Sequence, residues 1–192
     1  MSRSRPARLQ PQAHEVRLIG GIWKRSKLPV ADRPGLRPTP QRVRETLFNW
    51  LGQDLSGWRC LDAFAGSGAL GFEAASRGAA KVVMLDEDAH IVQSLQSSQQ
   101  RLGGAQIQIE RADAIGWMKR GVARSLDLIL LDPPFKAGLL QAAIDAAAVL
   151  VSDTGYLYAE ASEAMTQAVP GFEIWRQGHA GAVHFHLLRR SS

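Results

Sequence analysis

The chain passes from an expected strand into an expected helix through Cys60-Leu61-Asp62-Ala63-Phe64-Ala65-Gly66-Ser67-Gly68-Ala69-Leu70-Gly71. Its apolar first residues are typical of a buried strand, and a helix is predicted from about Ala69. Gly66, Gly68 and Gly71 satisfy the pattern G-x-G-x-x-G, which lets the backbone approach a ligand at a helix N-terminus. Because dinucleotides and other nucleosides share this pattern, it predicts a nucleoside site without naming the ligand.

Strands and helices alternate on both sides of this stretch, from Trp58 onward. Such alternation predicts an α/β fold with a mostly parallel sheet and helices on both faces. Two further strands around a Gly-rich turn break the alternation and predict an antiparallel C-terminal edge. We expect parallel strands at about 58–63, 81–86, 105–110, 126–131 and 155–160, intervening helices at about 69–77, 88–101, 113–120 and 137–150, and the edge strands Phe172–Arg176 and Val183–Leu188.

The region before Trp58 has a different character. Residues 1–14 lack periodicity and are expected to form a disordered basic arm. Val16–Lys24 predicts two short strands around Gly20-Gly21, and a Pro-rich loop follows at 28–38. Thr39 is then expected to N-cap a helix whose first residue is Pro40. The sequence thus divides into the arm 1–14, a small hairpin and helix extension at 15–57, and a cofactor-binding domain at 58–192.

Positive charge is concentrated at the N-terminus. The 192 residues carry a net charge of +5, but residues 1–44 contain eleven Lys and Arg side chains and only two acids. A basic segment on a slightly acidic body is typical of a nucleic-acid interface, although residues 1–12 alone also fit a solvated tail. Trp23 lies among basic neighbours, a setting that favours stacking on a base. The expected RNA-binding residues are Arg17, Trp23, Lys24, Arg25, Lys27, Arg37 and Arg42.

Asp62 narrows the choice of cofactor. A carboxylate just before the glycines would repel a pyrophosphate and attract an ammonium group. S-adenosylmethionine fits, because it has an α-amino group and a ribose but no phosphate. The same reasoning places further contacts on the loop and on the later strand ends. The expected cofactor-binding residues are Asp62, Phe64, Ala65, Gly66, Gly68, Asp86, Asp113 and Ala114.

The acids on the next two strands have local alternatives. Asp86 falls 24 residues after Asp62, near the spacing expected for a ribose-binding acid, but a dehydrogenase would share it. Glu87 and Asp88 are its neighbours, and Asp88 could instead cap the following helix. Asp113 is placed to accept from the adenine amino group, and it could also be an N-cap.

A stiff polar corner follows the fourth parallel strand at Asp132-Pro133-Pro134-Phe135. The prolines fix the backbone and donate no N–H, so their carbonyls are left to accept. A carboxylate beside an aromatic ring suits a flat base with an amino group, which would donate to Asp132 and stack on Phe135. We predict that these four residues hold the target base; the alternative is an ordinary turn in which Phe135 is a core residue.

Several classes of protein are excluded by composition. Cys60 is the only cysteine, so disulfides within the chain are excluded and a cysteine metal cluster is not expected. His184 and His186 share a strand face, but solvated or RNA-facing imidazoles are favoured over metal ligands. No apolar run approaches a membrane span, and no secretory signal is present, which predicts a cytoplasmic protein.

These motifs together resemble the class I S-adenosylmethionine-dependent methyltransferases that act on exocyclic amines. The closer resemblance is to the bacterial 16S ribosomal RNA guanine-N2 methyltransferases of the small subunit, and it extends from about residue 16 through nearly the whole chain. It rests on Arg17–Arg25, on Leu36–Leu51 and on Leu61–Gly71.

The resemblance implies a Rossmann-like methyltransferase sheet and methyl transfer to the N2 atom of a guanine. It implies that Asp62, Phe64, Gly66 and Gly68 form the cofactor loop, that Asp86 binds ribose, and that Asp113 binds adenine. It also implies a monomer acting on 16S rRNA within an assembled small subunit or late precursor, whereas the absence of a metal or membrane partner is expected from the composition.

Three alternatives remain open at the level of the sequence. A DNA adenine-N6 or cytosine-N4 methyltransferase would use the same strand-end motif, but 192 residues leave little room for a target-recognition domain. A dinucleotide-dependent oxidoreductase would explain Gly66-x-Gly68 and Asp86 but not the Asp132 corner. A non-catalytic RNA-binding assembly factor would have no need of Asp62 and Asp132.

Overall fold

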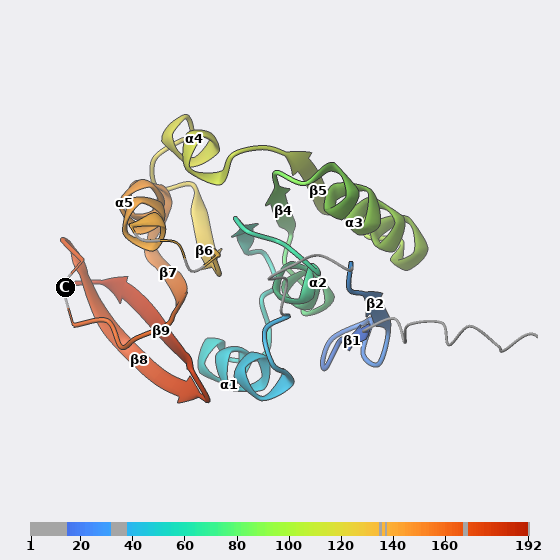
Figure 1. Ribbon diagram of the computed structural model, residues 1–192, viewed down its shortest axis with the longest axis horizontal. Helices are drawn as coiled ribbons and strands as arrows, with labels where there is room; N and C mark the ends of the chain where they lie inside the picture. The colour runs from blue at the N-terminus through green and yellow to red at the C-terminus, as the bar shows by residue number, and fades with distance from the viewer. Residues whose placement is uncertain (1–14, 32–37, 135, 137, 167–168, 192) are drawn as a thin grey trace, which may run out of the picture.

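The computed structural model describes residues 15–31, 38–134, 136, 138–166 and 169–191 (Figure 1). A seven-stranded sheet has the order β5-β4-β3-β6-β7-β9-β8, and the neighbours from β5 to β7 are parallel while β9 and β8 are antiparallel. The predicted parallel sheet and antiparallel edge are confirmed. The strands are β3 (Arg59–Asp62), β4 (Lys81–Asp86), β5 (Ile107–Arg111), β6 (Leu126–Leu131), β7 (Val151–Ala161), β8 (Phe172–Ala180) and β9 (Val183–Arg190).

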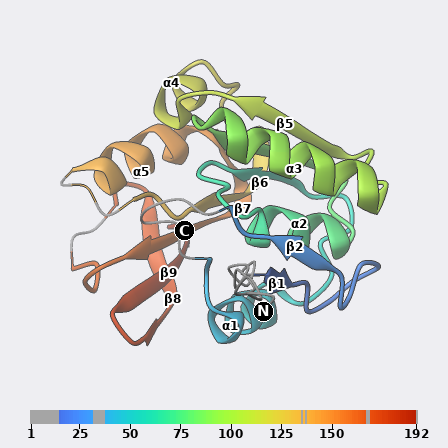
Figure 2. The ribbon, with the colours of Figure 1, turned by 45° about the vertical axis from the view of Figure 1, so that its right-hand side comes forward.

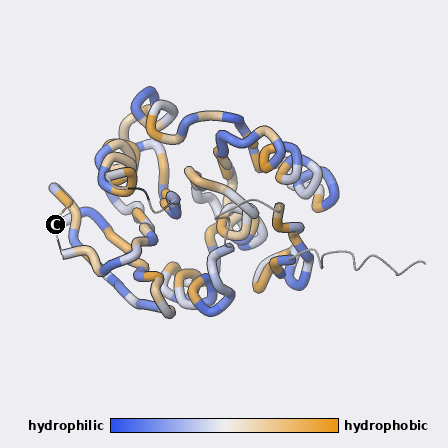
Figure 3. Tube along the Cα trace, in the orientation of Figure 1, coloured by the Kyte–Doolittle hydropathy of each residue, from blue (hydrophilic) through white to orange (hydrophobic). Residues whose placement is uncertain are grey.

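Within the described residues, five helices cover both faces of this sheet, as the alternation predicted. The core divides into two clusters: one joins α1, α2 and α3 to one face, and the other joins α4 and α5 to the opposite face. Colouring by hydropathy shows both hydrophobic and hydrophilic residues along α3, which buries Ile91, Leu95 and their neighbours (Figure 3). The helices are α1 (Gln41–Leu51), α2 (Ala69–Ser76), α3 (Ala89–Leu102), α4 (Ala114–Lys119) and α5 (Leu139–Leu150).

The N-terminal hairpin differs from its prediction. Strands β1 (Glu15–Arg17) and β2 (Lys27–Pro29) are paired antiparallel, so the second strand begins three residues after the predicted segment ends. Residues 18–26 form a loop beside α2 instead of a tight turn (Figure 2). The reason is that backbone N–H groups predicted to pair within a hairpin bond to α2: Ile22 N donates to the Ser76 carbonyl at 2.8 Å.

Helix α1 starts one residue later than predicted. Pro40 occupies the N-cap position, and no side chain caps the helix. The prediction that Thr39 is the N-cap is therefore wrong, because its hydroxyl donates instead to Oδ2 of Asp132 at 3.3 Å. Thr39 thus bonds to a residue 93 positions away in the sequence instead of capping its own helix.

A buried ionic network attaches the extension to α2. Glu73 is fully buried, and its Oε2 accepts from the Ile19 N–H at 2.9 Å and lies 3.5 Å from Nη1 of Arg44. Its Oε1 lies 2.9 Å from Arg77, whose guanidinium is over the ring of Phe48. Because unpaired buried charges are costly, these partners hold the hairpin, α1 and α2 in one arrangement.

Candidate functional site

Four acids follow or end neighbouring parallel strands. Asp62 and Asp86 end β3 and β4, Asp132 directly follows β6, and Glu160 lies one residue before the end of β7. Since carboxyl ends of parallel strands meet at one edge of a sheet, the first three predicted site acids are brought to that edge. Glu160 joins them there, although the sequence did not single it out.

Asp62 is a buried acid held by the start of α2. Its Oδ2 accepts from the backbone N–H of Gly71 at 2.9 Å, and the side chain is 1% exposed. Burial raises the pKa of Asp62 to about 7; the Gly71 bond opposes this effect, and the charges of Asp132 and Asp86 add to it. A cationic partner would therefore stabilise the ionised form of this carboxyl group, which burial and the neighbouring acids disfavour.

The loop between β3 and α2 is shaped by its glycines. Gly66 N donates to Oδ2 of Asp86 at 3.1 Å, which ties the loop to the end of β4. Gly68 has a φ of 77°, and a Cβ there would lie 2.6 Å from the Phe72 ring. A glycine is thus required where the loop enters the helix, and predicted residues 62, 66, 68 and 86 form one connected structure.

Asp88 and Asp113 both cap helices, which was the local alternative to a ligand-binding role for each of them. Asp88 accepts from the N–H of His90 at 2.8 Å, so its predicted role as a helix N-cap is confirmed. Asp113 caps α4 by accepting from Gly116 N at 2.7 Å, and its side chain is exposed. A cap bond does not occupy every lone pair of a carboxylate, so the predicted adenine contact of Asp113 stays a prediction.

The Asp132 corner combines burial with a defined hydrogen bond. Burial raises the pKa of Asp132 to about 6, while the bond from Thr39 opposes the shift. Pro133 is buried and Pro134 exposed, and the Pro134 carbonyl accepts from Lys136 N at 2.6 Å. The Pro133 carbonyl is therefore the better candidate to accept from a ligand. Phe135, predicted to stack on the base, lies outside the described residues.

Sequence reasoning did not identify three residues behind Asp132: Thr39, Tyr158 and Glu160. Tyr158 donates to Oε1 of Glu160 at 2.9 Å, and both side chains are buried. Burial raises the pKa of Glu160 to about 8, and the charge of Asp132 contributes. Position at a strand end could have identified Glu160, whereas nothing local marks Thr39 as a partner of Asp132.

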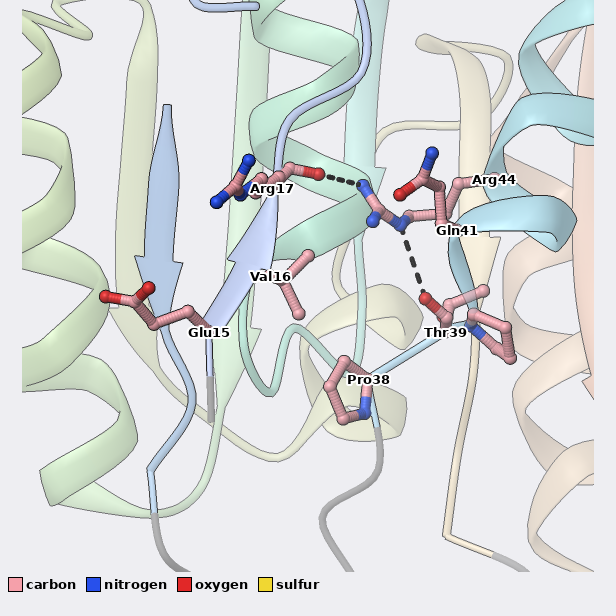
Figure 4. Close-up of a pocket in the computed structure, with 8 residues that line it drawn as sticks. Glu15, Val16, Arg17, Pro38, Thr39, Gln41 and Arg44 are labelled. Carbon is pink, nitrogen blue, oxygen red and sulfur yellow. Dashed lines mark hydrogen bonds between the residues drawn. The ribbon is translucent and has the colours of Figure 1, made fainter. Parts of the chain in front are cut away.

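A pocket of about 320 Å³ adjoins this corner (Figure 4). Its walls are strand β1, the segment 38–40 and the start of α1, and Thr39 belongs to both the pocket and the Asp132 corner. The Arg44 guanidinium crosses one wall, donating to the carbonyls of Arg17 at 3.0 Å and Thr39 at 3.3 Å. The pocket is thus lined by the N-terminal extension, and it is connected to the acidic edge of the sheet through the hydrogen bond of Thr39 to Asp132.

The predicted RNA-binding residues are mostly exposed. Trp23 is an exception, because it is half-buried and packs edge-on against Phe72 with ring centroids 6.4 Å apart. Lys27 pairs with Glu15 at 2.7 Å on the surface. Arg37 and the arm 1–14 lie outside the described residues. The exposed cations of the set are Arg17, Lys24, Arg25, Lys27 and Arg42.

The histidines of the C-terminal edge do not share one environment. His186 was expected to be solvated, but it is 1% exposed and its Nε2 accepts from the N–H of Met165 at 3.1 Å. This expectation was wrong because β9 lies inside the sheet, between β7 and β8. The part of the chain that the structure describes holds no group of three side chains suited to a metal ion. Nor does any of its helices have the length and apolarity to cross a bilayer.

Comparison with known proteins identifies relatives over most of the chain. The family model described as Conserved hypothetical protein 95 matches residues 16–189. Ribosomal RNA small subunit methyltransferase D of Escherichia coli strain K12 is 36% identical over 187 residues, covering 93% of this chain and 91% of that protein. The protein of the same name from Haemophilus influenzae is 44% identical over 133 residues, covering 68% and 69% of the two chains.

Solved structures agree with these matches. The yhhF protein of Escherichia coli has a TM-score of 0.82 at 33% identity, covering 92% of this chain and 98% of that chain. HI0767 of Haemophilus influenzae has a TM-score of 0.79 at 32% identity, covering 93% and 100%. The predicted methyltransferase fold and family resemblance are confirmed. The chain therefore belongs to the Conserved hypothetical protein 95 family, together with proteins named ribosomal RNA small subunit methyltransferase D.

Proposed function

We propose that the protein transfers a methyl group from S-adenosylmethionine to the exocyclic N2 atom of a guanine in 16S rRNA. The observation that carries this proposal is the meeting of Asp62, Asp86 and Asp132 at one sheet edge, beside a loop fixed by Gly66 and Gly68. The names of the relatives support ribosomal RNA of the small subunit as the substrate. The choice of guanine N2 comes from the sequence resemblance.

The residues present fit this cofactor. The site has a buried carboxylate at Asp62 and a partly buried one at Asp86, and residues 62–71 include no Lys or Arg side chain. Such a set suits an ammonium group and ribose hydroxyls better than a pyrophosphate. Asp62 would hold the α-ammonium group, Asp86 the ribose and Asp113 the adenine amino group. When bound, the cofactor supplies a methyl group on a sulfonium, which is already a reactive donor.

The chemistry assigned to the Asp132 corner follows from the target nitrogen. The lone pair of an exocyclic guanine amine is delocalised into the ring, so the amine is a weak nucleophile. Hydrogen bonds from its two N–H groups to the Asp132 carboxylate and the Pro133 carbonyl would turn the nitrogen toward a tetrahedral shape. As its nitrogen gains the methyl group the amine would become acidic, and the Asp132 carboxylate would accept one proton from it.

The extension at 15–57 is proposed to bind RNA. The exposed cations Arg17, Lys24, Arg25 and Arg42 lie on the hairpin and α1, which are attached to the catalytic domain through Glu73. A guanine must leave its stack to reach Asp132, and phosphate contacts would hold the flanking RNA while it does so. The proposed substrate is an assembled small subunit or late precursor, the site of action is the cytoplasm, and the protein acts as a monomer.

The proposal is tested by methyl transfer from labelled S-adenosylmethionine. Unmodified small subunits, bare 16S rRNA and duplex DNA are compared, and the methylated nucleoside is identified. N2-methylguanosine from the ribosomal substrates is expected. Label in DNA or in N6-methyladenosine would refute the substrate, and absence of label together with absence of cofactor binding would refute the enzyme.

Asp132→Asn tests the proposed acceptor. The variant keeps the shape of the side chain but loses its charge and most of its proton affinity, so we expect turnover to fall about 100-fold or more. Cofactor affinity should change only a few-fold. Asp145→Asn, on the outer surface of α5, is the matched control and should leave both quantities at wild-type values. Turnover of Asp132→Asn near the wild-type rate would exclude the proposed role.

A further inference from the structure

Thr39 occupies a position that its place in the sequence does not explain. It is 5% exposed, it precedes the helix without capping it, and its hydroxyl reaches Oδ2 of Asp132, 93 residues away. Within the described residues it is the only side chain that hydrogen-bonds to Asp132. The residue therefore joins the start of the extension helix directly to the proposed methylation site.

The backbone of Thr39 is fixed as firmly as its hydroxyl. Its carbonyl accepts from Nε of Arg44 at 3.3 Å (Figure 4). Arg44 is itself 2% exposed and paired with fully buried Glu73. Glu73 in turn accepts from the N–H of Ile19. A continuous series of contacts thus runs from α2 and the hairpin loop through Arg44 to Thr39.

A second carboxyl group competes for the Thr39 hydroxyl. Glu160, on the strand next to Asp132, is close enough to the Thr39 hydroxyl that hydrogen bonding from this group lowers the Glu160 pKa. A hydroxyl has one proton to donate and two lone pairs to accept with. When Glu160 is protonated it can donate to the Thr39 oxygen, which leaves the Thr39 proton for Asp132. Tyr158 donates a hydrogen bond to Oε1 of Glu160 and thereby holds the Glu160 carboxyl group in place.

We propose that Thr39 is a positioning residue for Asp132, and that neutral Glu160, held by Tyr158, directs the Thr39 hydroxyl toward it. The hydrogen bond occupies Oδ2 and orients the carboxylate so that Oδ1 faces the target amine. This inference rests on the proposed function, because it assigns Thr39 an effect on methyl transfer. Thr39 acts through Asp132 and does not touch the base.

The charged surroundings determine the pH range of this arrangement. Burial raises the pKa of both Glu160 and Asp132, and the charges of Asp132 and of Asp62 on β3 raise the Glu160 pKa further. The hydrogen bonds from Tyr158 and Thr39 lower the Glu160 pKa but do not cancel these effects. The guanidinium of Arg44 on α1 is engaged by Glu73 and two carbonyls. Near neutral pH the pair therefore carries one proton, which belongs on Glu160.

Thr39→Val tests the proposal, with Thr39→Ser as its matched control. Valine has almost the same shape but cannot donate, so we expect kcat to fall about 10- to 100-fold, with KM for the ribosomal substrate and Kd for S-adenosylmethionine within about twofold. The acid limb of the kcat profile should move to higher pH, because the hydrogen bond that valine cannot make lowers the Asp132 pKa. Serine keeps the hydroxyl and should restore both kcat and the limb.

A second variant addresses the direction of the hydroxyl. Glu160→Gln cannot ionise, and its amide N–H can donate to Thr39 at every pH. Any fall in wild-type kcat as the pH rises through about 8 should therefore be absent from this variant. A wild-type profile without such a fall, or an unchanged fall in Glu160→Gln, would overturn the role of Glu160.

The outcomes separate this inference from the proposed function. If Asp132→Asn is inactive but Thr39→Val retains full kcat, the methyltransferase assignment stands and the positioning role is rejected. If Thr39→Val weakens cofactor binding while kcat at saturation is unchanged, Thr39 belongs to the cofactor site instead. If wild type itself transfers no methyl group to any ribosomal substrate, the proposed function fails, and the positioning role with it.

Discussion

At the scale of single residues, Asp62 shows how burial prepares a carboxyl group for a cationic ligand. Its side chain accepts a hydrogen bond from Gly71 N, and it lies near Asp86 and Asp132, whose charges oppose its ionisation. A bound ammonium group would compensate for both burial and repulsion. The same carboxyl group in the absence of a cation is protonated far more readily than an exposed aspartate.

The affinity for S-adenosylmethionine should therefore depend on pH. Only ionised Asp62 attracts the ammonium group, and its pKa is about 7, so the fraction able to bind falls as the pH drops below that value. Kd measured by calorimetry should rise by about fivefold between pH 7 and pH 6, and change little above pH 8. Asp62→Asn should bind weakly at every pH. A wild-type Kd that stays constant from pH 6 to pH 8 would contradict this account.

The sequence predicted site residues where a local rule applies. Asp62, Asp86 and Asp132 are adjacent to strand ends, and the topology of parallel sheets brings such positions together. Thr39 shows where that reasoning stops. A threonine before a proline and a helical pattern is favoured as an N-cap, but its actual partner is separated from it by 93 residues. Such a partner becomes visible only when α1 has been placed on the sheet.

At the scale of elements, the predicted hairpin differs from the observed one because its loop also bonds to a partner far away in the sequence. The apolar and glycine pattern correctly indicated the first short strand and an antiparallel partner, but it placed that partner before Lys24, whereas the structure places it at Lys27–Pro29, partly in the predicted loop. It could not show that the residues between them bond to the end of α2, through the Ser76 carbonyl and hydroxyl. Gly20 and Gly21 therefore serve close approach to a neighbouring helix rather than a two-residue turn.

Gly21→Ala should loosen this attachment. Gly21 has a φ of 71°, and a Cβ would overlap the backbone carbonyl of Ser76, which cannot move without disturbing α2. Gly103→Ala is the matched control, since φ is 69° but no atom lies within 4 Å of the new Cβ. We expect the free energy of unfolding to fall by about 1–2 kcal/mol in the control and by about 3 kcal/mol or more in Gly21→Ala. Equal destabilisation of the two variants in urea melts would show that the contact with Ser76 does not matter.

At the scale of the whole molecule, charge is distributed so that the extension and the sheet have different roles. The exposed cations Lys24 and Arg25 lie on the hairpin loop, whereas the acids of the site lie at the carboxyl edge of the sheet. The charge asymmetry predicted from the sequence is thus preserved in the fold. How much this charge contributes to RNA affinity, however, depends on which side chains contact phosphates at the same time, and the composition does not specify that.

Salt dependence measures this contribution. Lys24→Gln with Arg25→Gln should reduce the slope of log K against log salt by about 0.7–0.9 for each phosphate that the variant no longer neutralises, since fewer counterions are released. The control pair Lys81→Gln and Lys119→Gln changes the net charge equally, but Lys81 begins β4 and Lys119 ends α4, both outside the N-terminal extension. Equal slopes for the two double variants would assign RNA binding to general charge instead of the hairpin.

The order of the last strands has a consequence for synthesis of the protein. The chain makes β8 before β9, yet β9 pairs with β7 and β8 pairs only with β9. When β8 has left the ribosome but β9 has not, β8 therefore has no native partner. The edge of β7 that pairs with β9 in the folded protein is also unpaired at this stage. This side of the sheet can close only after residues 183–190 have emerged, so ribosome stalling before that point would leave two unpaired strand edges available for aggregation.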